Sequence, residues 1–187
     1  MRIPWNEYFM LLAKLVSLRS TCLRRQVGAV IVKDRRVLAT GYNGQLPGRW
    51  HCDDNVRCWE KCPTKECIDL GVCPFDWPVE PECLKTVKGD ARYCRAVHAE
   101  ANAILQAAKL GIPLGGATIY CTLKPCPDCI KSIASAGIKR VVYGSDYYHD
   151  SPELWNFWKT ESGLEFEELR ISDMALDFVR KVLTNKE

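Results

Sequence analysis

The sequence predicts an α/β fold in which helices cover a mixed β-sheet. Gln26–Lys33 is a nearly continuous apolar run, as expected for a strand that is buried on both faces. A polar turn follows, and Val37–Tyr42 returns as a second strand, so the two strands form an antiparallel hairpin. From Val97 onward, helical and strand patterns alternate, which is typical of helices packed on a sheet.

Each remaining element has its own signal. Apolar residues recur at mostly helical spacing from about Asn6 to Arg19, which predicts a first helix before the hairpin. The alanine-rich stretch that begins at Val97 ends at Gly111, as expected for a helix that packs closely on a sheet. The later predicted elements are strands at Ala117–Thr122, Lys139–Tyr143 and Phe166–Arg170, and helices at Pro125–Ala136, Pro152–Thr160 and Asp173–Val182.

The length of 187 residues and the hydrophobic content of 47% suit a single domain over 1–187 with a substantial core. Residues 45–93 interrupt its regular pattern as a cysteine-rich insertion. A compact domain seldom holds so long an irregular stretch without a brace, and metal is the simplest one. Residues 161–187 form a C-terminal extension, which we expect to serve in packing or oligomerisation.

Composition and charge narrow the class of protein. The net charge of +3 fits an anionic small molecule and gives no support for nucleic acid binding. No run approaches the ~20 apolar residues of a membrane span. The apolar stretch Trp5–Val16 is interrupted by Glu7 and Lys14, and no cleavage site follows it. We therefore expect a cytoplasmic protein that binds no nucleic acid and no membrane.

The eleven cysteines point to metal in such a compartment. Clustered cysteines of reduced proteins are more often metal ligands than disulfides, and the odd number argues against complete pairing. The alternative is a hyperthermophile, whose intracellular proteins carry disulfides.

Two short motifs, His98-Ala99-Glu100 and Pro125-Cys126-Pro127-Asp128-Cys129, carry the chemistry. Cys126 and Cys129 are three residues apart at the start of a helix, so their sulfurs can converge on one metal, and the helix N-terminus favours thiolate. His98 supplies a nitrogen ligand. Three protein ligands leave the fourth tetrahedral position of Zn²⁺ open for water, whose pKa the metal lowers. Glu100 is predicted to transfer protons without binding the metal.

Each motif alone has a simpler explanation. A Cys-x-x-Cys pair is often a structural zinc knuckle or a redox pair, and an isolated His-x-Glu is usually accidental. In this order, each opening a predicted helix, the two motifs are identified as the signature of zinc-dependent deaminases, which replace an exocyclic amine of a base and release ammonia.

Further segments resemble the deoxycytidylate deaminases. Arg19–Val30 resembles the opening strand region of that family, and Gly41-Tyr42-Asn43-Gly44 is similar to its Gly-Tyr-Asn-Gly turn. Val97–Glu100, Ala136–Ile138 and Ser145–Ser151 also fit, so that the resemblance covers residues 5 to 155, with a weak stretch at 58–93.

This resemblance implies the cytidine-deaminase fold, a three-layer α/β/α arrangement with a central mixed sheet of about five strands. It also implies hydrolysis of dCMP to dUMP, which supplies thymidylate synthesis. A homo-oligomer (dimer, trimer or hexamer) is implied as well, with Mg²⁺ accompanying a nucleotide effector in regulated relatives. Two alternatives stay open: a deaminase of dCTP, cytidine or tRNA adenosine, and a non-catalytic zinc-binding partner subunit.

The resemblance also implies substrate contacts. Asn43 would contact the deoxyribose or the base, and Arg24, Arg25 and Tyr148 would contact the 5′-phosphate. The residues alone leave alternatives. Asn43 lies in a turn that leaves its side chain free for such a contact, but Asn43-Gly44 is also a routine hairpin-turn signal. A guanidinium suits phosphate, yet each arginine taken singly is more often an ordinary surface charge.

A second, structural zinc is implied for Cys22, Cys52 and Cys94, with Cys58 as the fourth ligand. Cys121 lies on a predicted core strand and is expected to be buried and inert. The remaining cysteines could form a third metal site or an iron–sulfur cluster, or could be free or disulfide-bonded: Cys62, Cys67, Cys73 and Cys83.

Overall fold

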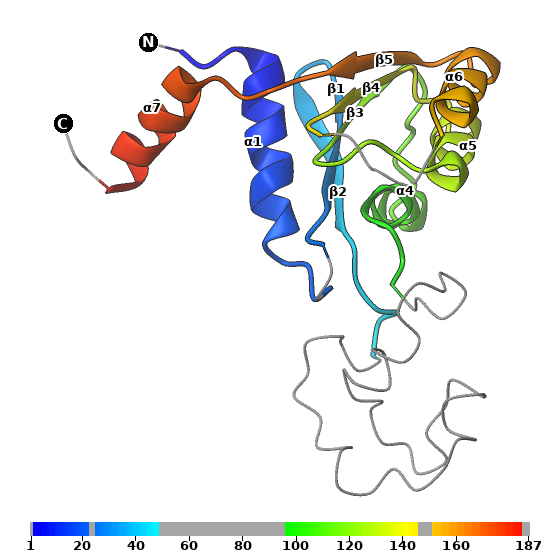
Figure 1. Cartoon of the computed structure of the whole chain (residues 1–187). Helices are drawn as coiled ribbons and strands as arrows, with labels where there is room; N and C mark the ends of the chain where they lie inside the picture. The colour runs from blue at the N-terminus through cyan, green and yellow to red at the C-terminus, as the bar shows by residue number, and fades with distance from the viewer. Residues whose placement is uncertain (1, 23–24, 49–95, 146–150, 185–187) are drawn as a thin grey trace, which may run out of the picture.

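The structure is a computed structural model that describes residues 2–22, 25–48, 96–145 and 151–184. A five-stranded mixed sheet organises it, in the order β2-β1-β3-β4-β5 (Figure 1). β1 (Gly28–Lys33) pairs antiparallel with β2 (Arg36–Tyr42) and with β3 (Thr118–Cys121). β4 (Arg140–Tyr143) pairs parallel with β3 and with β5 (Glu165–Glu168).

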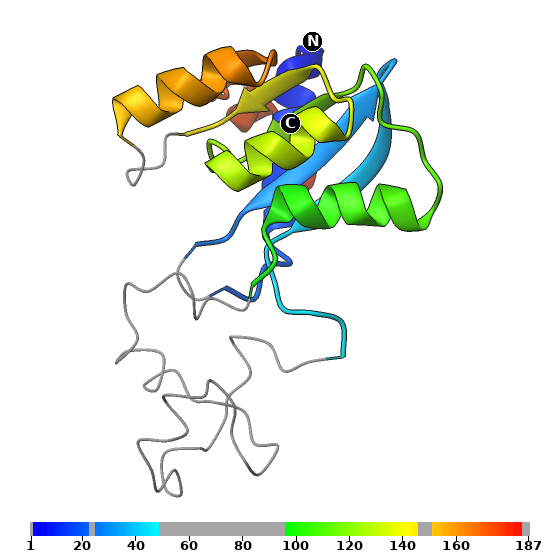
Figure 2. The ribbon, with the colours of Figure 1, turned by 90° about the vertical axis from the view of Figure 1, so that its right-hand side faces the viewer.

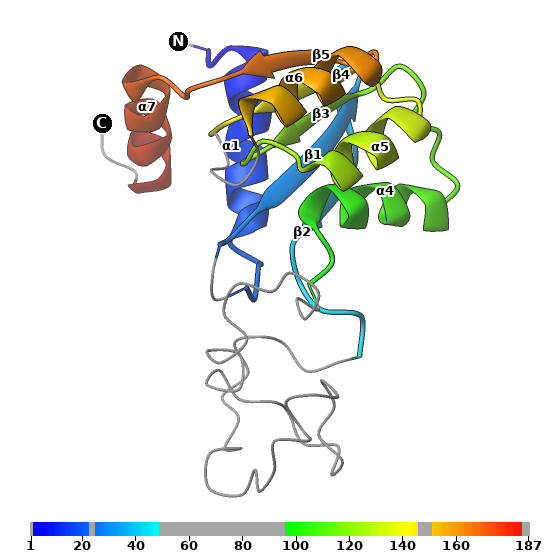
Figure 3. The same cartoon turned by 45° about the vertical axis from the view of Figure 1, so that its right-hand side comes forward.

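Helices lie on both faces of this sheet, which gives the three-layer α/β/α arrangement that was expected. α1 (Trp5–Ser17) covers one face, and α4 (Ala99–Lys109) and α5 (Pro127–Ser135) cover the other (Figure 1). α6 (Pro152–Glu161) lies beside α5, as Figures 2 and 3 show by bringing the side with α4 and α5 toward the viewer. α7 (Asp173–Thr184) lies beyond α1 and completes the described chain.

Two apolar clusters fill the spaces between the layers, and strand alternation divides the side chains between them. In β1, Ala29 and Ile31 face α4 and α5, whereas Val30 and Val32 face α1. Neighbouring positions of β3 and β4 divide in the same way. The strand is therefore buried on both faces, because side chains of successive residues point to opposite sides.

The hairpin between β1 and β2 turns at Asp34 and Arg35. Both residues have positive φ values, of 50° and 59°. A two-residue turn with positive φ at both positions matches the twist of paired strands, which explains why the hairpin closes here. Asn43-Gly44 follows the end of β2, and neither residue has the positive φ that a two-residue hairpin turn of this kind requires, so the alternative interpretation of that dipeptide is wrong.

The predicted elements that fall in the described ranges are confirmed, and their ends shift by no more than two residues. The two motif helices begin later than predicted because His98 and Cys126 are their N-caps and have extended backbones. No helix in the described ranges has the length and apolar character needed to cross a bilayer. The segment from 161 onward supplies the edge strand β5 and helix α7.

Candidate metal and catalytic site

The three predicted metal ligands converge at one end of the sheet. His98 precedes α4, Cys126 precedes α5, and Cys129 lies in the first turn of α5. His98 Nδ1 lies 3.5 Å from Cys126 Sγ and 3.4 Å from Cys129 Sγ, and the three ligand atoms all lie within 4.8 Å of one another. The fold produces this arrangement because β3 leads into α5 at the same end of the sheet where α4 begins (Figure 3).

The two thiols of this group have opposite pKa shifts. A hydrogen bond from Cys129 lowers the pKa of Cys126 to about 4, with His98 contributing in the same direction. The hydrogen bond to Cys126 and burial raise the pKa of Cys129. The hydrogen bond to Cys126 likewise raises the pKa of His98, whereas burial opposes that shift. A thiolate therefore forms readily in this group, as metal binding requires.

This donor set fits Zn²⁺. One imidazole nitrogen and two sulfurs are preferred zinc ligands, and three protein ligands are typical of catalytic zinc sites, which keep one position open. The exposure of the ligands is graded: His98 is exposed, Cys126 is half-buried and Cys129 is buried. Solvent and a small molecule can therefore approach the group from one side.

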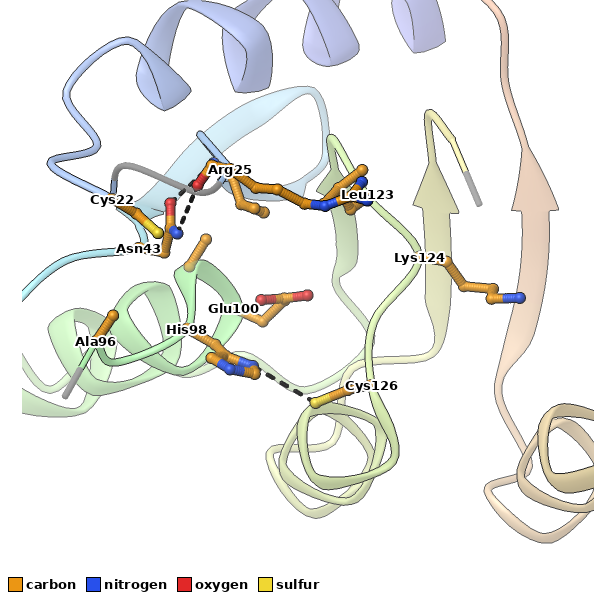
Figure 4. Close-up of a pocket in the computed structure, with 11 residues that line it drawn as sticks. Cys22, Arg25, Asn43, Ala96, His98, Glu100, Leu123, Lys124 and Cys126 are labelled. Carbon is orange, nitrogen blue, oxygen red and sulfur yellow. Dashed lines mark hydrogen bonds between the residues drawn. The ribbon is translucent and has the colours of Figure 1, made fainter. Parts of the chain in front are cut away.

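Glu100 lies in the first turn of α4, beside this group. Its side chain is only 4% exposed, and burial is the main cause that raises the pKa of its carboxyl above the ordinary value. Figure 4 shows the carboxylate extending into the pocket between His98 and Cys126 on one side and Arg25 on the other. A buried carboxyl with a raised pKa is suited to accepting and returning a proton near neutral pH.

A cavity with a volume of about 140 Å³ adjoins His98, Glu100 and Cys126. Its opposite wall comes from the segment before β1 and from the end of β2, which bring in residues distant in sequence (Figure 4). The lining residues are Cys22, Arg25, Val27, Asn43, Ala96, His98, Ala99, Glu100, Leu123, Lys124 and Cys126.

The Asn43 side chain is not free, contrary to the expectation for its turn. The residue is only 8% exposed. Its Oδ1 accepts hydrogen bonds from Ser20 Oγ at 2.6 Å and from the Val27 N–H at 2.8 Å. Its Nδ2 donates to the Arg25 carbonyl at 2.9 Å. Asn43 is thus a fixed part of the cavity wall.

The other predicted substrate and metal residues divide into two groups. Arg25 and Cys22 line the cavity, so they share a surface with the metal-ligand group. The rest lie outside the described residues: Arg24, Tyr148, Cys52, Cys58, Cys94, Cys62, Cys67, Cys73 and Cys83. Cys121 is fully buried, as predicted for a core position, and burial raises the pKa of its thiol.

Sequence reasoning did not single out Ser20, Thr122 and Lys124. Ser20 is buried and hydrogen-bonded to Asn43, and Thr122 Oγ1 accepts a hydrogen bond from the Gly28 N–H. Lys124 is 9% exposed, and its Nζ lies 4.5 Å from the ring centroid of Trp155. The spacing of small polar residues and of a single lysine does not predict such contacts, because their partners are distant in sequence.

Comparisons with known proteins agree with this geometry. The family model described as "Cytidine and deoxycytidylate deaminase zinc-binding region" matches residues 3–145. The chain is 39% identical over 178 residues to ComE operon protein 2 of Bacillus subtilis (strain 168), covering 94% of this chain and 77% of that protein. It is 42% identical over 142 residues to deoxycytidylate deaminase of Mycobacterium phage D29, covering 76% of this chain and 95% of that protein.

A solved structure also resembles this chain in fold and sequence. The dCMP deaminase from the cyanophage S-TIM5, determined in complex with dCMP and dUMP, superimposes with a TM-score of 0.62 at 30% identity. The match covers 90% of this chain and 99% of that one. The fold and the site together are those of a hydrolytic deaminase that uses Zn²⁺. The chain belongs to the cytidine and deoxycytidylate deaminase family.

Proposed function

We propose that this protein hydrolyses dCMP to dUMP and ammonia. The observation that carries the proposal is the juxtaposition of buried Glu100 with the group of His98, Cys126 and Cys129 in one cavity. Relatives that share 36–42% identity with the chain are named deoxycytidylate deaminases, which supports dCMP as the substrate. The product dUMP is consistent with a role in thymidylate supply.

His98, Cys126 and Cys129 would hold the zinc ion. When bound, Zn²⁺ supplies Lewis acidity that lowers the pKa of water at its open position toward neutrality. The first turn of α5 helps to keep the two sulfurs ionised, because the N-terminus of a helix stabilises negative charge.

Glu100 transfers the protons in the proposed reaction. A C–O bond forms between water and the ring carbon that carries the amine, and the C–N bond to that amine then breaks. Glu100 accepts one proton of the water and returns it to the neighbouring ring nitrogen. It then transfers the second proton, from the newly formed hydroxyl, to the amine, which leaves as ammonia. Its burial suits this role because a carboxyl with a raised pKa holds a proton more readily than an exposed one.

Asn43 and Arg25 would bind the nucleotide away from the reacting atoms. Both line the cavity on the wall opposite His98. An amide suits a hydroxyl or carbonyl of the nucleoside, and a guanidinium suits the 5′-phosphate. Arg24 and Tyr148 stay predictions as further phosphate contacts.

The second zinc, held by Cys22, Cys52, Cys58 and Cys94, stays part of the proposal. Cys22 lies beside the cavity, so a metal at this residue would brace the substrate wall. Assembly into a homo-oligomer, and Mg²⁺ with a nucleotide effector, are also predictions. Metal analysis tests the second zinc: about one zinc per chain would contradict the structural site, whereas about two would support it.

A substrate panel tests the function directly. The purified protein, with its zinc content measured, is assayed for ammonia release from dCMP, dCTP, cytidine and adenosine-containing tRNA. We expect turnover of dCMP to exceed that of the other three. Absence of dCMP turnover, with activity on another member of the panel, would overturn the assignment of dCMP as substrate. It would leave the proposed deamination chemistry intact.

A further inference from the structure

The end of α1 is linked to the substrate wall through Ser20. This serine is 7% exposed, and its N–H donates to the Ser17 carbonyl, which ties it to the last residue of α1. Its Oγ lies 2.6 Å from Asn43 Oδ1 and 2.9 Å from the Asn43 carbonyl oxygen, across 23 positions of sequence. The Cys22 N–H donates to the same Oγ at 3.2 Å.

These contacts determine where the hydroxyl proton of Ser20 goes. A serine hydroxyl has one proton and two acceptor lone pairs. Because the Cys22 N–H occupies an acceptor position, the proton is directed toward Asn43, and the 2.6 Å contact to Oδ1 is the shorter of the two available. Ser20 therefore donates to the side-chain amide of Asn43.

The surroundings of that amide fix its orientation. Two donors, Ser20 Oγ and the Val27 N–H, face Oδ1, and one acceptor, the Arg25 carbonyl, faces Nδ2. Exchange of the amide oxygen and nitrogen would place donor against donor at Val27. Both backbone partners belong to the irregular segment before β1, whereas Ser20 is attached to α1, which packs on the sheet.

One amide hydrogen then remains for a ligand. The described residues supply an acceptor for one of the two Nδ2 hydrogens of Asn43, namely the Arg25 carbonyl. Asn43 and Glu100 line the same cavity, so the second hydrogen is available to an acceptor on a molecule bound there. A sugar hydroxyl and a base carbonyl both offer such an acceptor oxygen.

We propose that Ser20 is a positioning residue for substrate binding, which holds the Asn43 amide so that its second N–H points at an acceptor oxygen of the nucleoside. This inference rests on the proposed function and names a residue that acts on the substrate only through Asn43. It predicts an effect on substrate binding rather than on the chemical step, because the contact lies away from the atoms that react.

The chain provides a matched control. Ser17 is also a buried serine at 7% exposure, and its hydroxyl donates to the Lys14 carbonyl of its own helix at 2.7 Å. Ser17→Ala therefore removes the same group at the same depth without touching Asn43. We expect Ser20→Ala to raise KM for dCMP about fivefold to tenfold, the size expected for one hydrogen bond, and to keep kcat within about twofold. Ser17→Ala should change neither constant by more than about twofold.

A double-mutant cycle shows whether Ser20 acts through Asn43. Asn43→Ala should raise KM, and Ser20→Ala added to it should have no further effect, because the group it positions is gone. Zinc content and melting temperature are measured for every variant, and kinetics are recorded well below each melting transition. If Ser20→Ala does not fold, Ser20→Cys takes its place, because a thiol is a weaker donor of similar shape.

The outcomes separate this inference from the proposed function. An unchanged KM in Ser20→Ala, or an equal KM increase in the Asn43→Ala background, overturns the positioning role and leaves the deaminase activity standing. Lack of dCMP turnover by the wild-type protein overturns the proposed substrate instead. The cycle is then measured on the panel nucleotide that the protein does turn over, and inactivity on every nucleotide overturns both.

Discussion

Gly41 in β2 and Ala99 in α4 approach each other so closely that no side chain fits between their backbones. A Cβ atom on Gly41 would stand 2.2 Å from the Ala99 carbonyl oxygen and 2.4 Å from the Ala103 nitrogen. Asn102 strengthens the contact, since its Nδ2 donates to the Tyr42 carbonyl at 2.8 Å. The first turn of α4, which carries Glu100, is thus held directly against the sheet.

Gly41→Ala is expected to disturb both stability and the site. The added methyl group meets backbone atoms that cannot rotate away, so the free energy of unfolding should fall by about 1–3 kcal/mol. Because α4 must shift, kcat should fall as well. Gly115→Ala is the control, since a Cβ there meets nothing within 4 Å. Urea unfolding and steady-state kinetics check both effects, and a Gly41→Ala protein as stable as wild type would contradict the close approach.

Glu100→Gln is expected to retain zinc and lose turnover. The amide keeps the shape of the carboxyl but cannot accept the proton of water, so kcat should fall by about 10²–10⁴-fold, the usual contribution of a general acid–base group. The zinc content should stay at the wild-type value, because Glu100 is not among the metal-ligand group. Glu165→Gln, at an exposed carboxyl of β5, is the matched control. Wild-type kcat in Glu100→Gln would remove the assigned role.

Comparison of Cys129→Ala with Cys121→Ala should separate the effect of losing a metal ligand from the effect of losing a buried side chain. Both thiols are buried, but only Cys129 belongs to the metal-ligand group. Cys129→Ala should lose the catalytic zinc equivalent, whereas Cys121→Ala should keep it and lose some stability through the cavity left in the core. Chelation should lower the melting temperature of Cys129→Ala by less than that of wild type, because the variant already lacks the catalytic zinc. Equal zinc loss in the two variants would refute the ligand assignment.

The catalytic group could be predicted from sequence because its information is local. His98 and Glu100 are two residues apart, Cys126 and Cys129 are three apart, and each motif opens a helix. The nearly continuous apolar run at 26–33 likewise predicted β1. Such short-range spacings survive any tertiary arrangement, so the fold class and the reaction chemistry followed from them.

The substrate wall could not be predicted in the same way, because it is assembled from distant segments. Asn43 was interpretable as a turn signal, whereas tertiary contacts with Ser20, Arg25 and Val27 bury its amide. Nothing in the spacing of Ser20 and Asn43 announces their hydrogen bond. The sequence signal for Asn43 came from resemblance, and Ser20 emerged only from the arrangement of α1 beside the end of β2.

The C-terminal helix α7 is anchored to the domain through Glu7 of α1. Glu7 Oε2 accepts hydrogen bonds from the Ser172 N–H at 3.1 Å and from Ser172 Oγ at 2.8 Å. Ser172 Oγ in turn accepts from the Ala175 N–H at 3.2 Å, as the cap of a helix does. Only Ala175 of this helix is buried, so the anchor contributes a large share of what holds the helix in place.

Glu7→Ala should therefore loosen α7 selectively. Loss of the two hydrogen bonds should lower the local stability of the helix by about 1 kcal/mol and speed amide exchange there about fivefold. Lys14→Ala, an exposed change on the same helix, should leave exchange unaltered. Hydrogen exchange resolved by peptide is the measurement, with peptides from β1 and β3 as the internal reference. Faster exchange in α7 alone would mark local opening at the anchor, because global destabilisation would also speed exchange in those central strands. Unchanged exchange in α7 would show that packing around Ala175, rather than Glu7, holds the helix.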